Sequence, residues 1–101
     1  MAAYVIVDIE VTDPEVYARY RELAPPIVAA FGGKYLMRGG ATETVEGTWQ
    51  PKRLVILEFP SMESIHTFYD SPEYAEAKAL RQTSTKSTMV FCEGLSVTGL
   101  G

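Results

Sequence analysis

The sequence predicts an α+β fold in which helices cover one face of a four-stranded antiparallel sheet. Two patterns predict it. Apolar residues recur at every second position in several short segments, as in strands, and at every third or fourth position in the segments between them, as in helices. A length of 101 residues suits one domain and leaves no room for two. We therefore expect a single domain over residues 1–101.

The first strand and the first helix are predicted near the N-terminus. Residues 3–11 alternate in side-chain character, which is the period of a strand. Asp13 is a good N-cap for a helix that follows it. The pair Pro25-Pro26 is expected to interrupt this helix and kink it, because proline lacks the backbone donor that a helix interior needs.

Two further strands are predicted in the middle of the chain. Residues 34–38 form the second strand, and residues 52–59 form the third. Gly39-Gly40 suggests a bulge or a bend after the second strand, and the residues that follow are compatible with extended backbone.

The second helix is expected to be split into two pieces. Ser61 caps the first piece, and Pro72 breaks it because proline disfavours helical geometry in the residue before it. The second piece then leads through a turn at residues 84–87 to a last strand at residues 88–97. The resulting order, β-α-β-β-α-β, is the ferredoxin-like arrangement with both helices on one face of the sheet.

Strand parity predicts which face each side chain occupies. In the first strand the purest apolar set is assigned to the helix side: Val5, Val7 and Ile9. A carboxylate is costly beneath packed helices unless it is paired, so Glu58 is assigned to the open face. The same reasoning puts Asp8 and Arg38 on the open face.

The open face combines charge with apolar surface. Ile6, Leu36, Leu54 and Ile56 would share it with the three charged residues, and so apolar a face should be covered by a partner, most simply a second copy. We therefore expect a homodimer.

Two interpretations of Asp8, Arg38 and Glu58 remain open. They form a structural ion network at the dimer interface, or Arg38 anchors a ligand oxygen while Glu58 or Asp8 acts as general base. In the second case Tyr17 or Tyr74 would hydrogen-bond the ligand.

Composition excludes several classes of function. The net charge is −4 and basic residues are scattered, so no nucleic-acid partner is expected. No apolar run approaches the roughly 20 residues that span a bilayer, so no membrane partner is expected. The lone Cys92 fits a reducing compartment, and we expect a cytoplasmic protein.

No metal and no cofactor are expected. The lone Cys92 and the single His66 supply neither a cysteine-based nor a multi-histidine metal site. The glycines near residues 39–47 match neither a dinucleotide-binding turn nor a phosphate loop.

Three segments resemble a known family. "YLMRGG", "VEGTWQPKRLVILEFPS" and "FYDSPEYAEAKALR" are similar to the domain-of-unknown-function 1330 family, and the likeness runs from Tyr4 to about Glu93. The resemblance implies a dimeric α/β barrel, in which two ferredoxin-like sheets pack face to face. The same superfamily includes cofactor-independent monooxygenases of antibiotic biosynthesis, muconolactone isomerases, dye-decolourising peroxidases, chlorite dismutase and the ligand-sensing domains of Lrp-type regulators. The family's signature positions include Ser61, which joins the candidate ligand-binding residues.

Two hypotheses of function follow. The first is a cofactor-independent enzyme that acts by acid/base chemistry on a small organic acid, lactone or phenolic compound, with Glu58, Asp8 and Arg38 as catalytic residues. The alternative is a non-catalytic small-molecule binding or stress-related module, in which the same three residues are structural.

Overall fold

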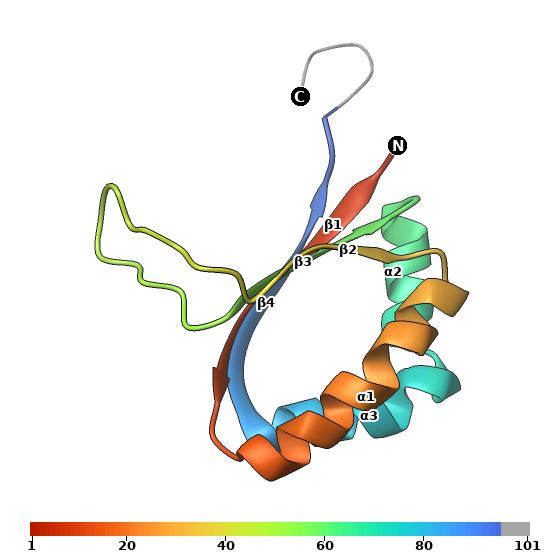
Figure 1. Cartoon of the computed structure of the whole chain (residues 1–101). Helices are drawn as coiled ribbons and strands as arrows, with labels where there is room; N and C mark the ends of the chain where they lie inside the picture. The colour runs from red at the N-terminus through yellow and green to blue at the C-terminus, as the bar shows by residue number, and fades with distance from the viewer. Residues whose placement is uncertain (96–101) are drawn as a thin grey trace.

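The computed structural model describes residues 1–95 and confirms the ferredoxin-like α+β fold (Figure 1). The elements are β1 (Ala3–Val11), α1 (Pro14–Ala30), β2 (Lys34–Arg38), β3 (Leu54–Phe59), α2 (Met62–Tyr69), α3 (Pro72–Ser84) and β4 (Thr85–Glu93). The strand order is β2-β3-β1-β4, and all neighbouring strands are antiparallel. Figure 1 shows the helices on the concave face of a curved sheet, while the other face is open. No helix among the described residues has the length and apolar character needed to cross a membrane.

The first helix is continuous, and the interruption predicted at Pro25-Pro26 is wrong. Asp13 caps the helix by accepting the Val16 amide at 3.3 Å. Pro25 cannot donate to the carbonyl four residues earlier, which leaves the Arg21 carbonyl without its helical donor. Arg38 fills that position, because its Nη2 donates to the Arg21 oxygen at 3.2 Å.

Serine caps define the two C-terminal helices. The Ser61 and Ser64 side chains bond each other's backbone amides at 3.0 Å, which forms a capping box for α2. The Ser71 hydroxyl accepts the Tyr74 amide at 3.1 Å and begins α3. Helix α2 ends before Asp70, so residues 1–95 contain three helices.

The last strand begins earlier than expected. The predicted turn at residues 84–87 is wrong, because α3 runs to Ser84 and β4 starts at Thr85. Thr85 already pairs with Val11 at the end of β1, so strand pairing extends the sheet over these residues. Residues 96 and 97 of the predicted strand lie outside the described residues.

Residues 39–53 form a long loop rather than a continuing strand. Every residue from Leu36 to Gln50 is exposed, and the loop projects away from the sheet on the side opposite the helices (Figure 1).

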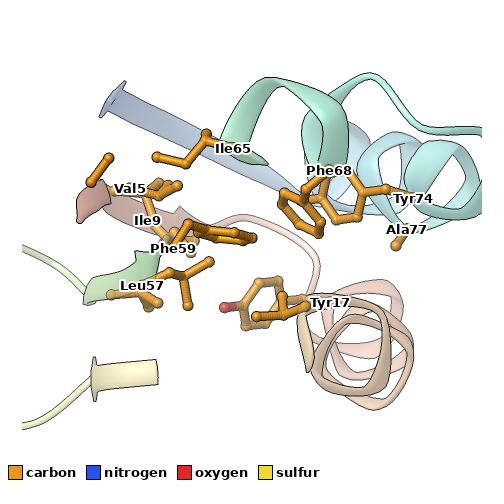
Figure 2. Packing of buried hydrophobic residues seen from close by; sticks show 13 residues of the cluster. Val5, Ile9, Tyr17, Leu57, Phe59, Ile65, Phe68, Tyr74 and Ala77 are labelled. Carbon is orange, nitrogen blue, oxygen red and sulfur yellow. The ribbon is translucent and has the colours of Figure 1, made fainter. Parts of the chain in front are cut away.

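The core lies between the sheet and the helices (Figure 2). Its sheet side is made by one parity of β1 and β3: Ala3, Val5, Val7, Ile9, Val55, Leu57 and Phe59. Its helix side is strongly aromatic: the ring centroids of Phe68 and Tyr74 are 4.3 Å apart, and those of Phe59 and Phe68 are 5.1 Å apart. The predicted face assignment of β1 and β3 is therefore confirmed.

Candidate functional site

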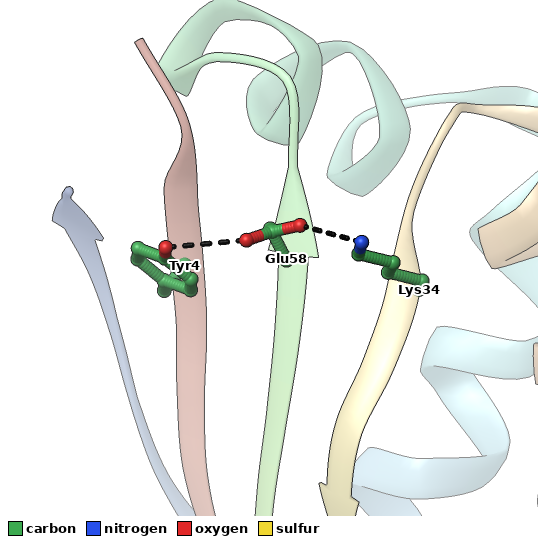
Figure 3. Close-up of polar contacts among 3 residues, drawn as sticks. All are labelled: Tyr4, Lys34 and Glu58. Atoms are coloured by element: carbon green, nitrogen blue, oxygen red, sulfur yellow. Dashed lines mark hydrogen bonds and ion pairs between the residues drawn. The ribbon is translucent and has the colours of Figure 1, made fainter.

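Glu58 lies on the open face of the sheet, as predicted. Its carboxylate accepts the Tyr4 hydroxyl at 3.2 Å and lies 3.1 Å from the Lys34 ammonium (Figure 3). The bond from Lys34 holds the pKa of Glu58 below its usual value, and the bond to Glu58 raises the pKa of Tyr4. The partners of Glu58 are therefore Tyr4 and Lys34, which the sequence reasoning did not single out.

Asp8 also lies on the open face, where it anchors the projecting loop. Its carboxylate accepts Trp49 Nε1 at 2.9 Å and the backbone amides of Lys52 and Arg53 at 2.8 and 3.3 Å. The bond from Trp49 is the main cause of a lowered Asp8 pKa. Because Asp8 fixes the backbone of Arg53, it also helps to set where the Arg53 side chain begins.

Arg38 lies on the helix side of the sheet, so its predicted place on the open face is wrong. The cause is a bulge in β2: Tyr35 pairs with Leu57, and Met37 pairs with the next residue of β3, Ile56. Leu36 is the extra residue, and it shifts every later side chain of β2 to the opposite face.

The three predicted catalytic residues are consequently not neighbours. Asp8, Arg38 and Glu58 share no hydrogen bond or ion pair, and Arg38 is on the opposite face from the two acids. The predicted three-residue ion network is therefore not formed within the chain. A catalytic role for each residue stays a prediction.

A narrow cavity lies between the sheet and the helices, and Arg38 is at its mouth. Its volume of about 30 Å³ is enough for one or two water molecules. Apolar side chains from β1, β3 and β4 line its sheet side. The polar lining consists of tyrosines and arginines: Tyr17, Tyr20, Tyr35, Tyr69, Tyr74, Arg21, Arg38 and Arg53.

The arginines at the mouth are not paired with acids. Arg53 Nε donates to the Tyr17 hydroxyl at 3.1 Å, and the Arg38 guanidinium lies 4.9 Å from the centroid of the Tyr35 ring. In residues 1–95 the only ion pair is Lys34–Glu58, on the other face. The cavity mouth therefore presents cationic groups whose charge is not neutralised by a carboxylate.

The inner end of the cavity carries two bonded phenol hydroxyls. The oxygens of Tyr20 and Tyr74 are 3.0 Å apart, and Tyr74 is only 1% exposed. Burial, together with Tyr74, raises the pKa of Tyr20 far above its usual value, and burial raises that of Tyr35. The Tyr20 and Tyr35 hydroxyls are therefore neutral at ordinary pH and act as hydrogen-bond donors and acceptors.

Three of the four predicted ligand-binding residues line this cavity. Arg38, Tyr17 and Tyr74 do so, whereas Ser61 lies outside it and caps α2. The sequence reasoning missed Arg53, although it shares the parity of Val55 and Leu57 and so belongs to the helix side.

The residues that line the cavity are better suited to bind an anion than to bind a metal ion or to abstract a proton. Among the lining residues within 1–95 no carboxylate or histidine is present. Across the same residues, no three His, Cys, Asp or Glu side chains are grouped as metal ligands would be.

Comparison with known families places the chain in one of them. The family DUF1330, described as a domain of unknown function, matches residues 2–95. The chain belongs to this family. No curated protein matches it.

Solved structures similar to this DUF1330 chain share its fold at low sequence identity. The RPA0582 protein of unknown function from Rhodopseudomonas palustris is 20% identical, with a TM-score of 0.78 over 94% of this chain and 83% of that chain. A dimeric ferredoxin-like protein of unknown function from Jannaschia sp. CCS1 is 13% identical, with a TM-score of 0.68 over 93% and 100% of the two chains. SnoaB, a cofactor-independent oxygenase from Streptomyces nogalater, is 11% identical, with a TM-score of 0.58 over 95% and 94%. At these identities the likeness concerns the fold.

Proposed function

We propose that this protein binds a small organic anion with an apolar body in the cavity between sheet and helices. The observation that carries the proposal is the meeting of Arg21, Arg38 and Arg53 at one cavity mouth, with no acid bonded to any of them in residues 1–95. The chain as a whole has a net charge of −4, so this cationic cluster is not a consequence of a basic composition.

The cavity chemistry fits a carboxylate attached to a ring or a short apolar chain. A guanidinium matches a carboxylate with two parallel hydrogen bonds. The wall behind the arginines is apolar and aromatic, and a few tyrosine hydroxyls provide polar contacts, which is the usual composition of small-molecule sites.

Binding requires the mouth to open. A volume of about 30 Å³ holds water but not an aromatic ring. Arg38 is exposed and lies over Tyr35, and an exposed cation–π contact contributes only about 0.5–1 kcal/mol. Its other contact, the exposed hydrogen bond to the Arg21 carbonyl, can be replaced by a bond from water to that carbonyl. An anionic ligand that draws Arg38 outward would therefore open the cavity at small cost.

The proposed binding does not use the two open-face acids. Glu58 and Asp8 lie across the sheet from the cavity, so their predicted role as general bases would need a separate site. Under this proposal Glu58→Gln leaves the affinity for a cavity ligand unchanged.

Calorimetric titration with matched anionic and neutral compounds tests the proposal. Benzoate and hexanoate are titrated beside benzamide and hexanamide, which have the same shape without the charge. We expect the carboxylates to bind and the amides to bind at least tenfold more weakly. The exposed Arg19→Gln variant controls for net charge. Absence of binding by every carboxylate, or equal binding of acids and amides, would contradict the proposal.

We also propose that two copies pair through the open sheet face. Leu36, Met37 and Val90 are 48%, 45% and 53% exposed, and exposed apolar patches of this kind mark interfaces. Val90 lies opposite Ile6 across the β1–β4 pair and so belongs to the open face. The similar Jannaschia protein is described as dimeric. Sedimentation at micromolar concentration tests this proposal: a mass of two chains is expected, and a folded monomer would contradict it.

A further inference from the structure

A buried cation lies behind the inner end of the cavity. Arg81 of α3 is only 5% exposed, and its Nε has no hydrogen-bond partner. Arginine stays protonated at ordinary pH, and a buried charge is costly without a compensating group. The single ion pair within residues 1–95 involves other residues, so no acid neutralises Arg81 there.

Three tyrosines, one from each helix, face Arg81. They are Tyr20 of α1, Tyr69 of α2 and Tyr74 of α3, and they are the titratable groups that interact electrostatically with Arg81, Tyr74 most strongly. All three line the cavity, whereas Arg81 does not. Arg81 therefore neighbours three tyrosines of the cavity lining without lining the cavity itself.

A cation in this position orients the O–H bonds of the neighbouring tyrosines. A guanidinium can only donate hydrogen bonds, and a hydroxyl near it is most stable with its oxygen towards the positive charge. The Tyr20 and Tyr74 hydroxyls are bonded to each other, so one of the two hydrogens is used between them. The other hydrogen is then turned away from Arg81, towards the cavity.

This inference rests on the proposed function. We propose that Tyr20 and Tyr74, backed by Arg81, form a second polar subsite that takes an acidic hydroxyl of the ligand, a phenol or an enol, at the end opposite its carboxylate. The ligand class is then a small carboxylic acid with an ionisable hydroxyl on an unsaturated carbon. Arg81 is a positioning residue, because it acts on the ligand through the two hydroxyls.

The subsite should favour the ionised form of the bound hydroxyl. When the phenol ionises, its proton leaves to water and the negative oxygen remains near the buried cation. An opposite charge within about 4–6 Å lowers the pKa of an acid by about 1–3 units. We expect the low end of that range, about 1 unit, because Arg81 does not itself line the cavity.

Absorbance titration of a bound nitrophenol tests the subsite. The probe is 4-hydroxy-3-nitrobenzoate, whose phenolate absorbs visible light, and its phenol pKa is measured free and at saturating protein. In the wild-type complex the pKa should fall by about 1 unit. In Arg81→Gln the probe should still bind, with its pKa returned to the free value.

Two controls separate this subsite from the mouth of the cavity. Arg38→Gln should weaken binding but leave most of the pKa decrease, and the exposed Arg19→Gln should change neither quantity. If Arg81→Gln does not fold, as judged by circular dichroism, Tyr74→Phe replaces it with the same expected loss of the pKa decrease.

The outcomes are distinct. A probe that binds wild type without a lowered pKa, or whose lowered pKa persists in Arg81→Gln, overturns the subsite and leaves the proposed function standing. If neither benzoate nor the probe binds wild type, the proposed function fails and the subsite fails with it.

Discussion

Replacing Arg38 should weaken anion binding far more than it weakens the fold. The side chain makes two contacts in the folded chain: a hydrogen bond to the Arg21 carbonyl at 3.2 Å and a cation–π contact with Tyr35 at 4.9 Å. Both involve an exposed side chain, so water replaces much of what is lost. We expect Arg38→Gln to lower the free energy of unfolding by about 1 kcal/mol.

The effect on binding is larger because the carboxylate would lose a charged partner. Hydrogen bonds to charged groups contribute about 1.5–3 kcal/mol. That range corresponds to a dissociation constant for benzoate raised about 10- to 150-fold. Urea unfolding and calorimetric titration measure the two quantities on the same preparations, and Arg19→Gln controls for the loss of one charge.

Two results would refute this reasoning. An unchanged affinity in Arg38→Gln would mean that the anion does not bind at the cavity mouth. An equal loss in Arg38→Gln and Arg19→Gln would mean that only the overall charge of the protein matters.

Three further predictions concern the fold and its assembly. The bond from Trp49 is the main cause of a lowered Asp8 pKa in the folded chain. The Asp8 carboxylate therefore stabilises the fold fully above the ordinary aspartate pKa of 3.8, and this stabilisation is lost as the pH falls through the lower pKa of the folded state. Thermal melts of wild type should therefore show a loss of stability below about pH 4 that Asp8→Asn lacks, and identical pH profiles would contradict this. Gly33→Ala places a methyl group 2.6 Å from the Phe59 ring, so urea unfolding should show a free energy of unfolding lowered by about 1–3 kcal/mol. An unchanged urea midpoint would contradict this and show that the core accommodates the methyl group. Val90→Lys should leave the chain folded, as judged by circular dichroism, but give the mass of a monomer on sedimentation. An unchanged mass would place the interface elsewhere.

Much of the fold could be predicted because simple alternation holds in the two central strands. β1 and β3 keep a strict period of two, so the reasoning that a carboxylate avoids packed helices placed Glu58 correctly. β2 is short and contains an extra residue at Leu36, with no glycine or proline to mark it. Alternation therefore gave the wrong face for Arg38, and the predicted three-residue network depended on that face.

Some residues in and beside the cavity could be predicted from the periodicity of the strands and helices. Arg53 precedes a buried strand on its buried parity, and Arg81 follows Tyr74 by seven residues on the buried face of α3. Both positions contradict the rule that charged residues face solvent, and that rule was applied to Glu58 but not to them. The neighbours of Asp8 could not be predicted, because Trp49 reaches it from a loop without a regular pattern.

A crystal structure of the benzoate complex would test the central claim most directly. We predict that the ring lies between the sheet and the helices, with its carboxylate about 3 Å from the guanidinium of Arg38 or Arg53 and with Arg38 moved off Tyr35. Benzoate bound on the open sheet face, beside Lys34 and away from the arginines, would contradict the account.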